Sequence, residues 1–299
     1  MNKWILLITV ILGQACGDSN NTSTDSSEEE AKVEITTSEA KTQEEAEQEV
    51  TNSKPDQLFL GFYVGYFEGV DMDFDKDPVP YNKITIAIDS LSKGILYGHS
   101  IVAGNERPFS GPYTMAGDSI KAVANEPGDD RYDGVFTFAI LPQDEVLVGT
   151  WKANNKRLAV SSRQYNLDKR TFSYDPNVEL PEEVSFSNLY EKYPKYPDKE
   201  ESLTEDVLKF NASSYELKKE DIENMYQGDL EVMRNAIYAR HGYSFRNRKM
   251  RFIFDHGVEW YMPVSTDIRG QLTALEKKNI DLLKRYEQHA ARYYDEFGR

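Results

Sequence analysis

Cysteine is nearly absent from this chain of 299 residues, which carries a single copy at Cys16. One cysteine excludes an internal disulfide, and its place near the N-terminus leaves the rest of the chain without a thiol nucleophile. Histidine is scarce too, and the HExxH zinc pattern does not occur. The four histidines lack metal-ligand spacing, at His99, His241, His256 and His289. The sequence therefore predicts neither a histidine metal site nor a cofactor.

Positive charge is in deficit, because 35 lysines and arginines face 51 aspartates and glutamates for a net charge of −16. A surface of this sign repels nucleic-acid phosphates, so no nucleic-acid partner is expected. The GxSxG nucleophile elbow is missing as well, since GHSIV at 98–102 has valine where the second glycine belongs. We predict no catalytic residue and a non-enzymatic protein, with a serine triad assembled from distant residues as the open alternative.

Long apolar runs are limited to the first residues, where Lys3 precedes the run from Trp4 to Leu12. That run is too short to span a bilayer core of about 30 Å as a helix, and it is typical of a secretory signal. Small residues lead up to Cys16, so the stretch resembles a bacterial lipoprotein signal in which this cysteine receives lipid. We expect a signal peptide over residues 1–15, lipidation at Cys16 and a membrane partner held through acyl chains.

Residues 16–56 are rich in Ser, Thr, Asn, Gln and Glu and contain no aromatic residue. Three lysines face twelve acids between positions 17 and 56. Such a segment cannot bury enough apolar surface to offset the entropy lost on ordering, so we predict a disordered acidic tether. The folded parts would then be displayed from the bacterial cell envelope, at the outer membrane or the cell surface.

Residues 57–175 predict antiparallel β structure. About eight short segments rich in β-branched and aromatic residues, such as KITIAIDSL and GVFTFAIL, are separated by turn signals such as SKG and AGD. This spacing leaves no room for helical crossovers, so the expected fold is an antiparallel β-barrel or a sandwich. Gly61, Gly65 and Gly69 in the first segment are typical of a bend at a barrel corner.

The interior of such a barrel is either filled by its own side chains or holds one small ligand. The aromatic residues available to fill it are Phe62, Tyr66, Phe109, Tyr113, Phe136, Phe138 and Trp151. The run Gly149, Thr150 and Trp151 resembles a short motif of lipocalin-like and avidin-like barrels, which implies a similar architecture without naming a ligand. Carriage of a small apolar ligand is therefore an alternative function.

Alternating aspartates mark the stretch DMDFDKDPVPYN at 71–82. Asp71, Asp73, Asp75 and Asp77 are spaced like the start of a calcium loop. The stretch lacks the glycine and the final glutamate of such a loop. An irregular calcium site therefore competes with an acidic solvated loop between strands.

Residues 176–204 predict a linker, because they are rich in proline, tyrosine and acids, and prolines break any regular pattern. From 205 to 299 the apolar period becomes helical. The pattern predicts helices within 214–225, 228–242 and 246–257, and a long final helix from near Asp267.

The stretch from Tyr238 to Gly242 reads YARHG and resembles the YARHG domain family, a small bacterial extracellular domain. The likeness covers about residues 205–287. It includes Arg234, Asn235, Phe245, the WYxP pattern of Trp260, Tyr261 and Pro263, and Glu276, Asn279, Ile280 and Tyr286. The resemblance implies a helical module in an exported protein but no activity. The expected fold class is multi-domain α and β, with the barrel or sandwich followed by a small all-α YARHG module.

Two interpretations are open for the motif. Gly242 is expected to end a helix in the left-handed conformation, with His241 facing the helix carbonyls, and Arg240 either bridges loops or clamps an anion. Six basic residues and no acid lie between 234 and 251, and they either bind anionic envelope groups or pair with the acids of the module. The candidate binding residues are Tyr238, Arg240, His241, Arg246, Arg248, Arg251, Trp260 and Tyr261, with Asn235, Gly242 and Pro263 as structural residues.

From these patterns we expect a binding module that recognises envelope glycans, lipids or proteins. Besides carriage by the barrel, the resemblance implies a further alternative, an accessory or sensor domain of a peptidase or kinase system. A pocket that holds a histidine, a carboxylate and a hydroxyl within hydrogen-bond reach would favour an enzyme. No pattern in the sequence indicates an oligomeric state.

Overall fold

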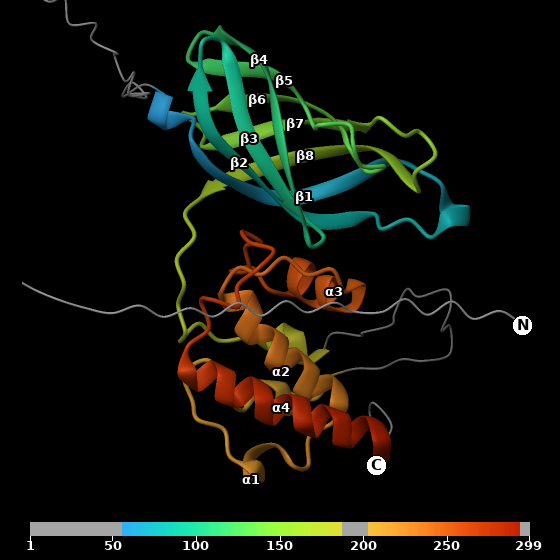
Figure 1. The fold of residues 1–299 in the computed structure, drawn as a ribbon, viewed down its shortest axis with the longest axis vertical. Helices are drawn as coiled ribbons and strands as arrows, with labels where there is room; N and C mark the ends of the chain where they lie inside the picture. The colour runs from blue at the N-terminus through green and yellow to red at the C-terminus, as the bar shows by residue number, and fades with distance from the viewer. Residues whose placement is uncertain (1–55, 187–202, 294–299) are drawn as a thin grey trace, which may run out of the picture. The chain divides into compact units, whose positions relative to one another are not determined.

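The computed structural model describes residues 56–186 and 203–293 (Figure 1). The predicted signal peptide, Cys16 and the acidic tether lie outside the described residues, as does part of the predicted linker. Residues Glu49–Arg299 form one compact unit that holds both the β part and the helical part.

Eight strands form a closed antiparallel barrel. Each strand pairs with its neighbour in the chain, and the last strand closes on the first. This arrangement confirms the predicted barrel and excludes the sandwich, because a sandwich would leave strand edges unpaired. The strands are β1 (Gly61–Met72), β2 (Tyr81–Ser92), β3 (Ile95–Val102), β4 (Asn105–Ala116), β5 (Ser119–Asn125), β6 (Gly134–Leu141), β7 (Val146–Ala153) and β8 (Val160–Arg170).

Tight turns explain why consecutive strands pair. Lys93 and Gly94 join β2 to β3, and Ala103 and Gly104 join β3 to β4, with positive φ at all four residues. Two left-handed residues in succession give a turn whose twist matches that of the flanking strands. The second residue is glycine in both turns because this conformation costs glycine little.

The barrel interior follows the period of two that strands impose, and most of it is solid. Tyr63, Phe67 and Tyr165 are among the buried core residues, whereas Tyr66 is exposed. The prediction that Phe62 and Tyr66 fill the barrel is therefore wrong. The next residues along β1, Tyr63 and Phe67, face inward instead, because successive side chains of a strand point to opposite faces. The interior aromatic residues that the sequence did predict are Phe109, Phe136, Phe138 and Trp151, with Tyr113 packed against them.

The helical part contains four α-helices, α1 (Lys219–Ile222), α2 (Gln227–Arg240), α3 (Arg248–Gly257) and α4 (Ala274–Tyr293), among the described residues. Short 3₁₀ turns, η1 (Asp56–Leu58), η2 (Phe74–Lys76), η3 (Glu182–Phe186) and η4 (Glu205–Leu208), precede or join these elements. The helices predicted within 228–242 and 246–257 are confirmed as α2 and α3. None of the helices in the described ranges has the length and apolar character that crossing a membrane would require.

Two predicted helix boundaries need correction. The helix expected within 214–225 shrinks to the single turn α1, because the Asn279 side chain bonds the carbonyls of Ala212 and Tyr215 and the N–H of Leu217. The final helix begins at Ala274 rather than near 267. Thr273 Oγ1 accepts from the N–H of Glu276 and Glu276 Oε2 accepts from the N–H of Thr273, which is a capping box that fixes the start.

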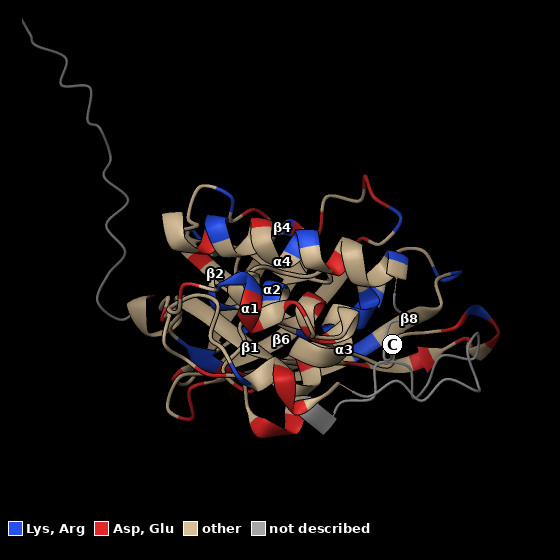
Figure 2. Cartoon of the chain, turned by 90° about the horizontal axis from the view of Figure 1, so that it is seen from below, with Lys and Arg blue, Asp and Glu red and all other residues tan. Residues whose placement is uncertain are grey.

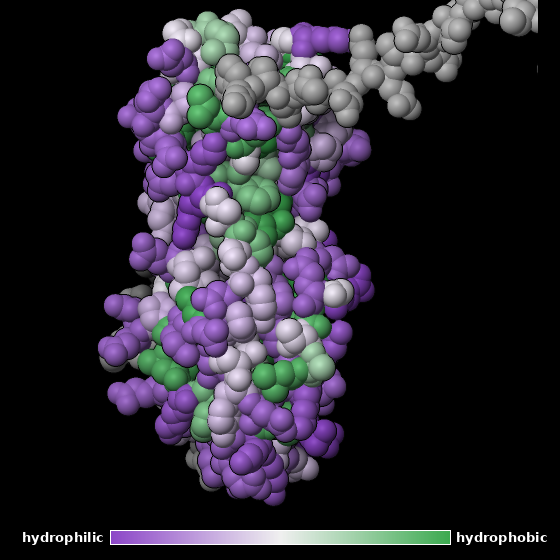
Figure 3. Space-filling view, turned by 90° about the vertical axis from the view of Figure 1, so that its left-hand side faces the viewer, coloured by the Kyte–Doolittle hydropathy of each residue, from purple (hydrophilic) through white to green (hydrophobic). Residues whose placement is uncertain are grey.

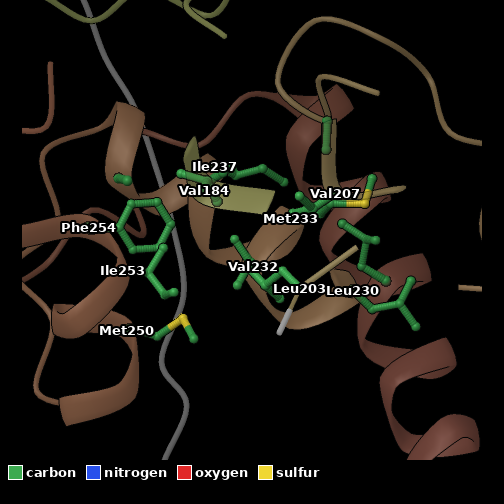
Figure 4. Packing of buried hydrophobic residues seen from close by; sticks show 14 of the residues in the cluster. Val184, Leu203, Val207, Leu230, Val232, Met233, Ile237, Met250, Ile253 and Phe254 are labelled. Atoms are coloured by element: carbon green, nitrogen blue, oxygen red, sulfur yellow. The ribbon is translucent and has the colours of Figure 1, made fainter. Parts of the chain in front are cut away.

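Buried apolar residues from several elements form the core of the helical part (Figure 4). Leu230, Met233 and Ile237 come from one face of α2, as their spacing predicts. Ile253 and Phe254 of α3 lie against the same core. On the face drawn in Figure 3, hydrophilic residues frame the hydrophobic ones. The helices are therefore held by tertiary packing of their apolar faces.

Candidate binding site at the mouth of the barrel

One end of the barrel interior is polar. Asn82 precedes the core residues Ile84 and Ile86 on the inward face of β2, and Arg163 precedes Tyr165 on the inward face of β8. Both positions follow from the alternation of side chains along a strand. The residues of this polar layer are Asn82, Ser100, Arg107, Glu126 and Arg163, all of which line one cavity.

This cavity, the mouth cavity, has a volume of about 380 Å³ and lies above the aromatic core. Phe67, Phe136 and Trp151 form its apolar floor, and Arg251 reaches its wall from α3 of the helical part. Ligand pockets in proteins have volumes of roughly 300–1,000 Å³ and combine apolar walls with a few polar groups. The mouth cavity meets both criteria.

Arg163 is the most unusual residue of the mouth cavity. The residue is 8% exposed, and its guanidinium lies over the Phe67 ring at 5.0 Å from the centroid. It donates to the carbonyls of Phe67 at 2.7 Å, Val79 at 3.0 Å and Pro80 at 3.4 Å. No carboxylate of the described residues pairs with it. Burial, with a contribution from the nearby Arg251, lowers the pKa of Arg163 to about 10.

Asn82 lines the same cavity, and its hydrogen-bonding capacity is unused. The residue is 7% exposed, and its Oδ1 atom is buried without a hydrogen-bond partner among the described residues. A buried amide without a partner costs about 1–3 kcal/mol. Such groups in folded proteins point to water, an ion or a ligand that completes the bonding.

The other charged residues of the polar layer are paired. Arg107 Nη1 lies 2.7 Å from Asp133 Oδ1, and its Nη2 lies 3.0 Å from Asp130 Oδ1. Glu126 Oε2 accepts from the N–H of Gly134 at 2.7 Å and from the indole N–H of Trp151 at 3.0 Å. Burial raises the pKa of Glu126 above its ordinary value despite these bonds. The two sides of the cavity therefore differ, with compensated charges near β4 and β5 and an uncompensated cation on β8.

Sequence reasoning missed this site, although a signal was present. Period-two alternation in VSSRQYNL places Arg163 on the same face as Tyr165 and Leu167, two core residues. A charged residue at an inward position is rare unless it is paired or functional. Following the phase of β8 would have predicted Arg163 as a site residue.

The structure places Arg240 in the interior of the helical part. It is 4% exposed, and its Nε donates to the carbonyl of Val178 at 2.8 Å. Its guanidinium lies 5.9 Å from the Trp260 ring, and the indole N–H of Trp260 donates to the carbonyl of Glu179 at 2.8 Å. Burial lowers the pKa of Arg240 to about 10. Arg240 and Trp260 thus hold the segment that follows the barrel. Of the two roles considered for Arg240, bridging loops and clamping an anion, this contact is the first.

His241 and Glu276 form a buried pair beside this segment. His241 Nε2 lies 2.8 Å from Glu276 Oε2, and the His241 ring stacks on Tyr174 with centroids 4.1 Å apart. Tyr174 donates its hydroxyl hydrogen to Glu276 Oε1 at 3.0 Å, and Ser213 contributes a further hydrogen bond. A histidine, a carboxylate and two hydroxyls therefore meet, but the side chains of His241, Glu276 and Ser213 are nearly inaccessible to solvent.

Tyr238 is the one residue of the five-residue motif that is not buried. It lines a hollow of about 650 Å³ together with Asn235, Tyr243, Phe245 and Arg246. This hollow, the motif groove, lies within the helical part. Asn235 donates its side-chain N–H to the carbonyl of Glu231 at 2.8 Å, which gives this residue a structural bond.

The remaining motif residues stabilise the backbone. Gly242 has φ of 71°, the left-handed conformation that the sequence predicts after a helix. Tyr261 is buried and donates its hydroxyl hydrogen to the carbonyl of Tyr243 at 2.7 Å. Pro263 is also buried. These placements are those of packing residues.

The basic cluster contacts the barrel and its own helix, and acidic and basic positions are interspersed over the chain (Figure 2). Arg246 Nε donates to the carbonyl of Gly104 at 3.0 Å, and Arg248 Nη1 lies 2.6 Å from Asp77 Oδ2. Arg251 Nη1 donates to the carbonyl of Arg246 at 2.5 Å. These contacts favour the interpretation in which the cluster pairs within the protein.

Asp73, Asp75 and Asp77 lie around η2, between β1 and β2. Asp73 accepts from the N–H of Asp75 and pairs with Lys76, while Asp77 pairs with Arg248. Within residues 56–186 and 203–293, no three His, Cys, Asp or Glu side chains come together in a way that could hold a metal ion. These contacts favour the acidic loop between strands over an irregular calcium site.

Comparison with known proteins identifies one region of the chain. Residues 205–288 match the YARHG domain. No curated protein and no solved structure shows significant similarity to the chain.

Proposed function

Since residues 205–288 form a YARHG domain that follows a closed barrel, we propose that this chain is a non-enzymatic envelope protein that binds a small ligand in the mouth cavity. The observation that carries the proposal is a contrast inside one barrel. Most of the interior is packed with aromatic and aliphatic side chains, whereas the mouth is hollow, apolar at its floor and lined by polar groups. Among the described residues, Asn82 Oδ1 has no hydrogen-bond partner and Arg163 has no carboxylate partner. A barrel used only as a scaffold gains nothing from burying Arg163 and Asn82 in this way.

The YARHG domain has a supporting role in this proposal. Its motif residues Arg240 and Trp260 fix the segment after the barrel, and Arg246 bonds the turn at Gly104. Arg251 reaches the wall of the mouth cavity. The domain would therefore close one side of the cavity and keep its shape constant, which lowers the ordering cost of binding.

Anchoring by lipid at Cys16 belongs to the same proposal and is supported by the apolar run from Trp4 to Leu12. The test is the mass of the mature protein expressed from the full chain. A chain that begins at Cys16 and carries acyl groups is expected, and Cys16→Ser should release the protein from membranes. A mature chain without acyl groups would overturn this part of the proposal.

Ligand binding is tested with a neutral fluorescent aromatic probe, N-phenyl-1-naphthylamine, and residues 49–299. Val102 lines the mouth cavity, and Val123 is exposed on the outer face of the barrel. We expect Val102→Trp to fill the cavity and abolish the fluorescence increase, whereas Val123→Trp should leave it unchanged. A wild-type protein that gives no signal, or equal signals from both variants, would overturn the proposal.

A second candidate function is recognition of an envelope glycan, lipid or protein by the motif groove. The observation in its favour is that Tyr238 lines a hollow of about 650 Å³ while the rest of the five-residue motif is buried. Co-sedimentation with peptidoglycan and with anionic vesicles separates the first two ligands. Tyr238→Ala should reduce the amount of protein that co-sediments. Tyr215→Ala changes an exposed tyrosine outside the groove and should leave that amount unchanged. Equal sedimentation of both variants would exclude the groove.

A further inference from the structure

The charges around the mouth cavity indicate what kind of ligand it takes. Arg107 is compensated by Asp130 and Asp133. Among the described residues, by contrast, the guanidinium of Arg163 bonds only carbonyl oxygens and lies over the Phe67 ring. Removing a cation from water without an anion beside it is costly, and the cost is relieved when an anion arrives. The mouth cavity therefore favours a ligand that carries negative charge.

The position of Arg163 on the barrel determines where that charge would lie. Arg163 on β8 and Asn82 on β2 flank β1, which contributes Phe67 to the floor. Two carboxylates line the cavity and would repel an anion. Glu126 follows β5 on the other side of the barrel, and Asp77 in the β1–β2 loop is paired with Arg248. The anionic group is thus expected on the β8–β1–β2 side, away from Glu126.

Donor groups remain available on this side. The three hydrogen bonds of Arg163 use Nη1 and Nη2, and its Nε donates to no acceptor in the part of the chain that the structure describes. The Asn82 amide forms no side-chain hydrogen bond within the described part of the chain and can turn its NH₂ group toward the cavity. Arg251, whose Nη1 is bonded to the carbonyl of Arg246, places a second positive charge at the wall. Guanidinium and amide donors together match the oxygens of a carboxylate or a sulfonate.

We infer, on the basis of the function proposed above, that the ligand is a small organic acid whose anionic oxygens lie between Arg163, Asn82 and Arg251. Its apolar body lies on Phe67 and Trp151, because these rings form the floor below the donors. A volume of about 380 Å³ lies in the range of pockets for small ligands. The acid's charge decides affinity, and the aromatic floor decides orientation.

Two probes with the same body test this inference on residues 49–299. The anionic probe is 8-anilinonaphthalene-1-sulfonate, and the neutral probe is N-phenyl-1-naphthylamine, which lacks the sulfonate. The variants are Arg163→Gln and Arg251→Gln. The control is Arg157→Gln, which removes one positive charge from an exposed position of the β7–β8 loop that does not line the cavity.

The wild-type protein should bind the anionic probe more tightly than the neutral one. Arg163→Gln should lower the affinity for the anionic probe about tenfold or more. Its affinity for the neutral probe should change less than about twofold. Arg251→Gln leaves Arg163 in place and should lower the affinity for the anionic probe by about threefold to tenfold. Arg157→Gln should match the wild type.

The possible outcomes separate this inference from the function on which it rests. Equal affinity of the wild type for both probes would overturn the organic-acid ligand and leave small-ligand binding standing. Equal loss of both probes in Arg163→Gln, with Arg251→Gln unchanged, would also overturn it, because the arginine would then act only on the shape of the barrel. Failure of the wild type to bind either probe would overturn the proposed function itself.

Discussion

The backbone N–H of Lys83 donates a hydrogen bond of 2.9 Å to Oδ2 of Asp255, so strand β2 of the barrel meets helix α3 of the YARHG domain at a buried carboxylate. The Lys83 ammonium donates to the carbonyls of Val258 and Tyr261, each at 3.0 Å. Burial raises the pKa of Asp255 to about 7 and lowers the pKa of Lys83 to about 8. We therefore expect the contact between barrel and YARHG domain to be sensitive to pH.

We predict that the free energy of unfolding of residues 49–299 falls between pH 5 and pH 7.5, and that Asp255→Asn removes most of this fall. A carboxyl with a pKa of about 7 when folded and near 4 when unfolded binds more protons in the folded state. Its contribution is therefore complete below pH 4 and lost as the pH rises through 7. The effect is roughly 1–3 kcal/mol, measured by urea unfolding at four pH values.

The matched control for this experiment is Asp267→Asn, at an exposed carboxyl whose hydrogen bonds with Arg269 lower its pKa to about 2. It is charged throughout the range tested, so its pH profile should parallel that of the wild type. A profile of Asp255→Asn that also runs parallel would show that Asp255 is not the titrating group.

The buried pair of His241 and Glu276 should contribute strongly to stability. Although burial opposes it, hydrogen bonds from His241 and from the N–H of Thr273 lower the pKa of Glu276 to about 2. Glu276→Gln leaves His241 and Tyr174 with a weaker partner. We expect the free energy of unfolding to fall by about 2–4 kcal/mol at pH 7. Thermal unfolding with calorimetry measures it. The stabilisation is present above pH 4.5 and is lost as the pH falls toward 2.

Glu216→Gln supplies the comparison for that variant, because Glu216 forms an exposed ion pair with Lys278. Exposed pairs contribute little, so its melting temperature should equal that of the wild type. Equal melting temperatures for the two glutamine variants would contradict a structural role of the His241–Glu276 pair.

The barrel was predictable from sequence because short alternating segments and turn residues leave few other folds. Its interior was not, since Phe62 and Tyr63 both fit a strand, and which of them faces inward depends on how β1 pairs with β2 and β8 in the closed barrel. The start of α4 could have been predicted from the sequence, because the spacing of Thr273 and Glu276 is that of a capping box. The capping box is a more specific signal than the apolar period, which placed the start of this helix near Asp267.

The roles of the motif residues were beyond the sequence for a different reason. The partner of Arg240 is the carbonyl of Val178, and the partner of Trp260 is the carbonyl of Glu179, both in the segment after the barrel. Backbone carbonyls carry no residue-specific signal, so no pattern marks them. The partners of Arg163 were beyond the sequence for the same reason, because they are the carbonyls of residues on β1 and in the β1–β2 loop, although the phase of β8 marks the residue itself.

Arg240→Lys tests the clamp on the segment after the barrel. Lysine keeps the charge but loses the planar set of donors, so the bond to Val178 and the contact with Trp260 should weaken by about 1–3 kcal/mol. We expect chymotrypsin to cleave after Phe172 or Tyr174 faster than in the wild type. Arg269→Lys changes an exposed arginine in the same way and should be cleaved at the wild-type rate. Equal cleavage rates would show that Arg240 does not hold the segment.

Gly242 should tolerate no side chain. Its φ of 71° is costly for other residues, and a Cβ atom there would lie 2.4 Å from Val264 Cγ2 and 3.0 Å from the carbonyl oxygen of Met262. We expect Gly242→Ala to destabilise residues 49–299 by about 2–4 kcal/mol, because strain and overpacking add. Gly270→Ala places a methyl group with no neighbour within 4 Å and should change stability by less than about 0.5 kcal/mol. Urea unfolding of the two variants measures the difference, and equal midpoints would mean that the loop after α2 relaxes around the new methyl group.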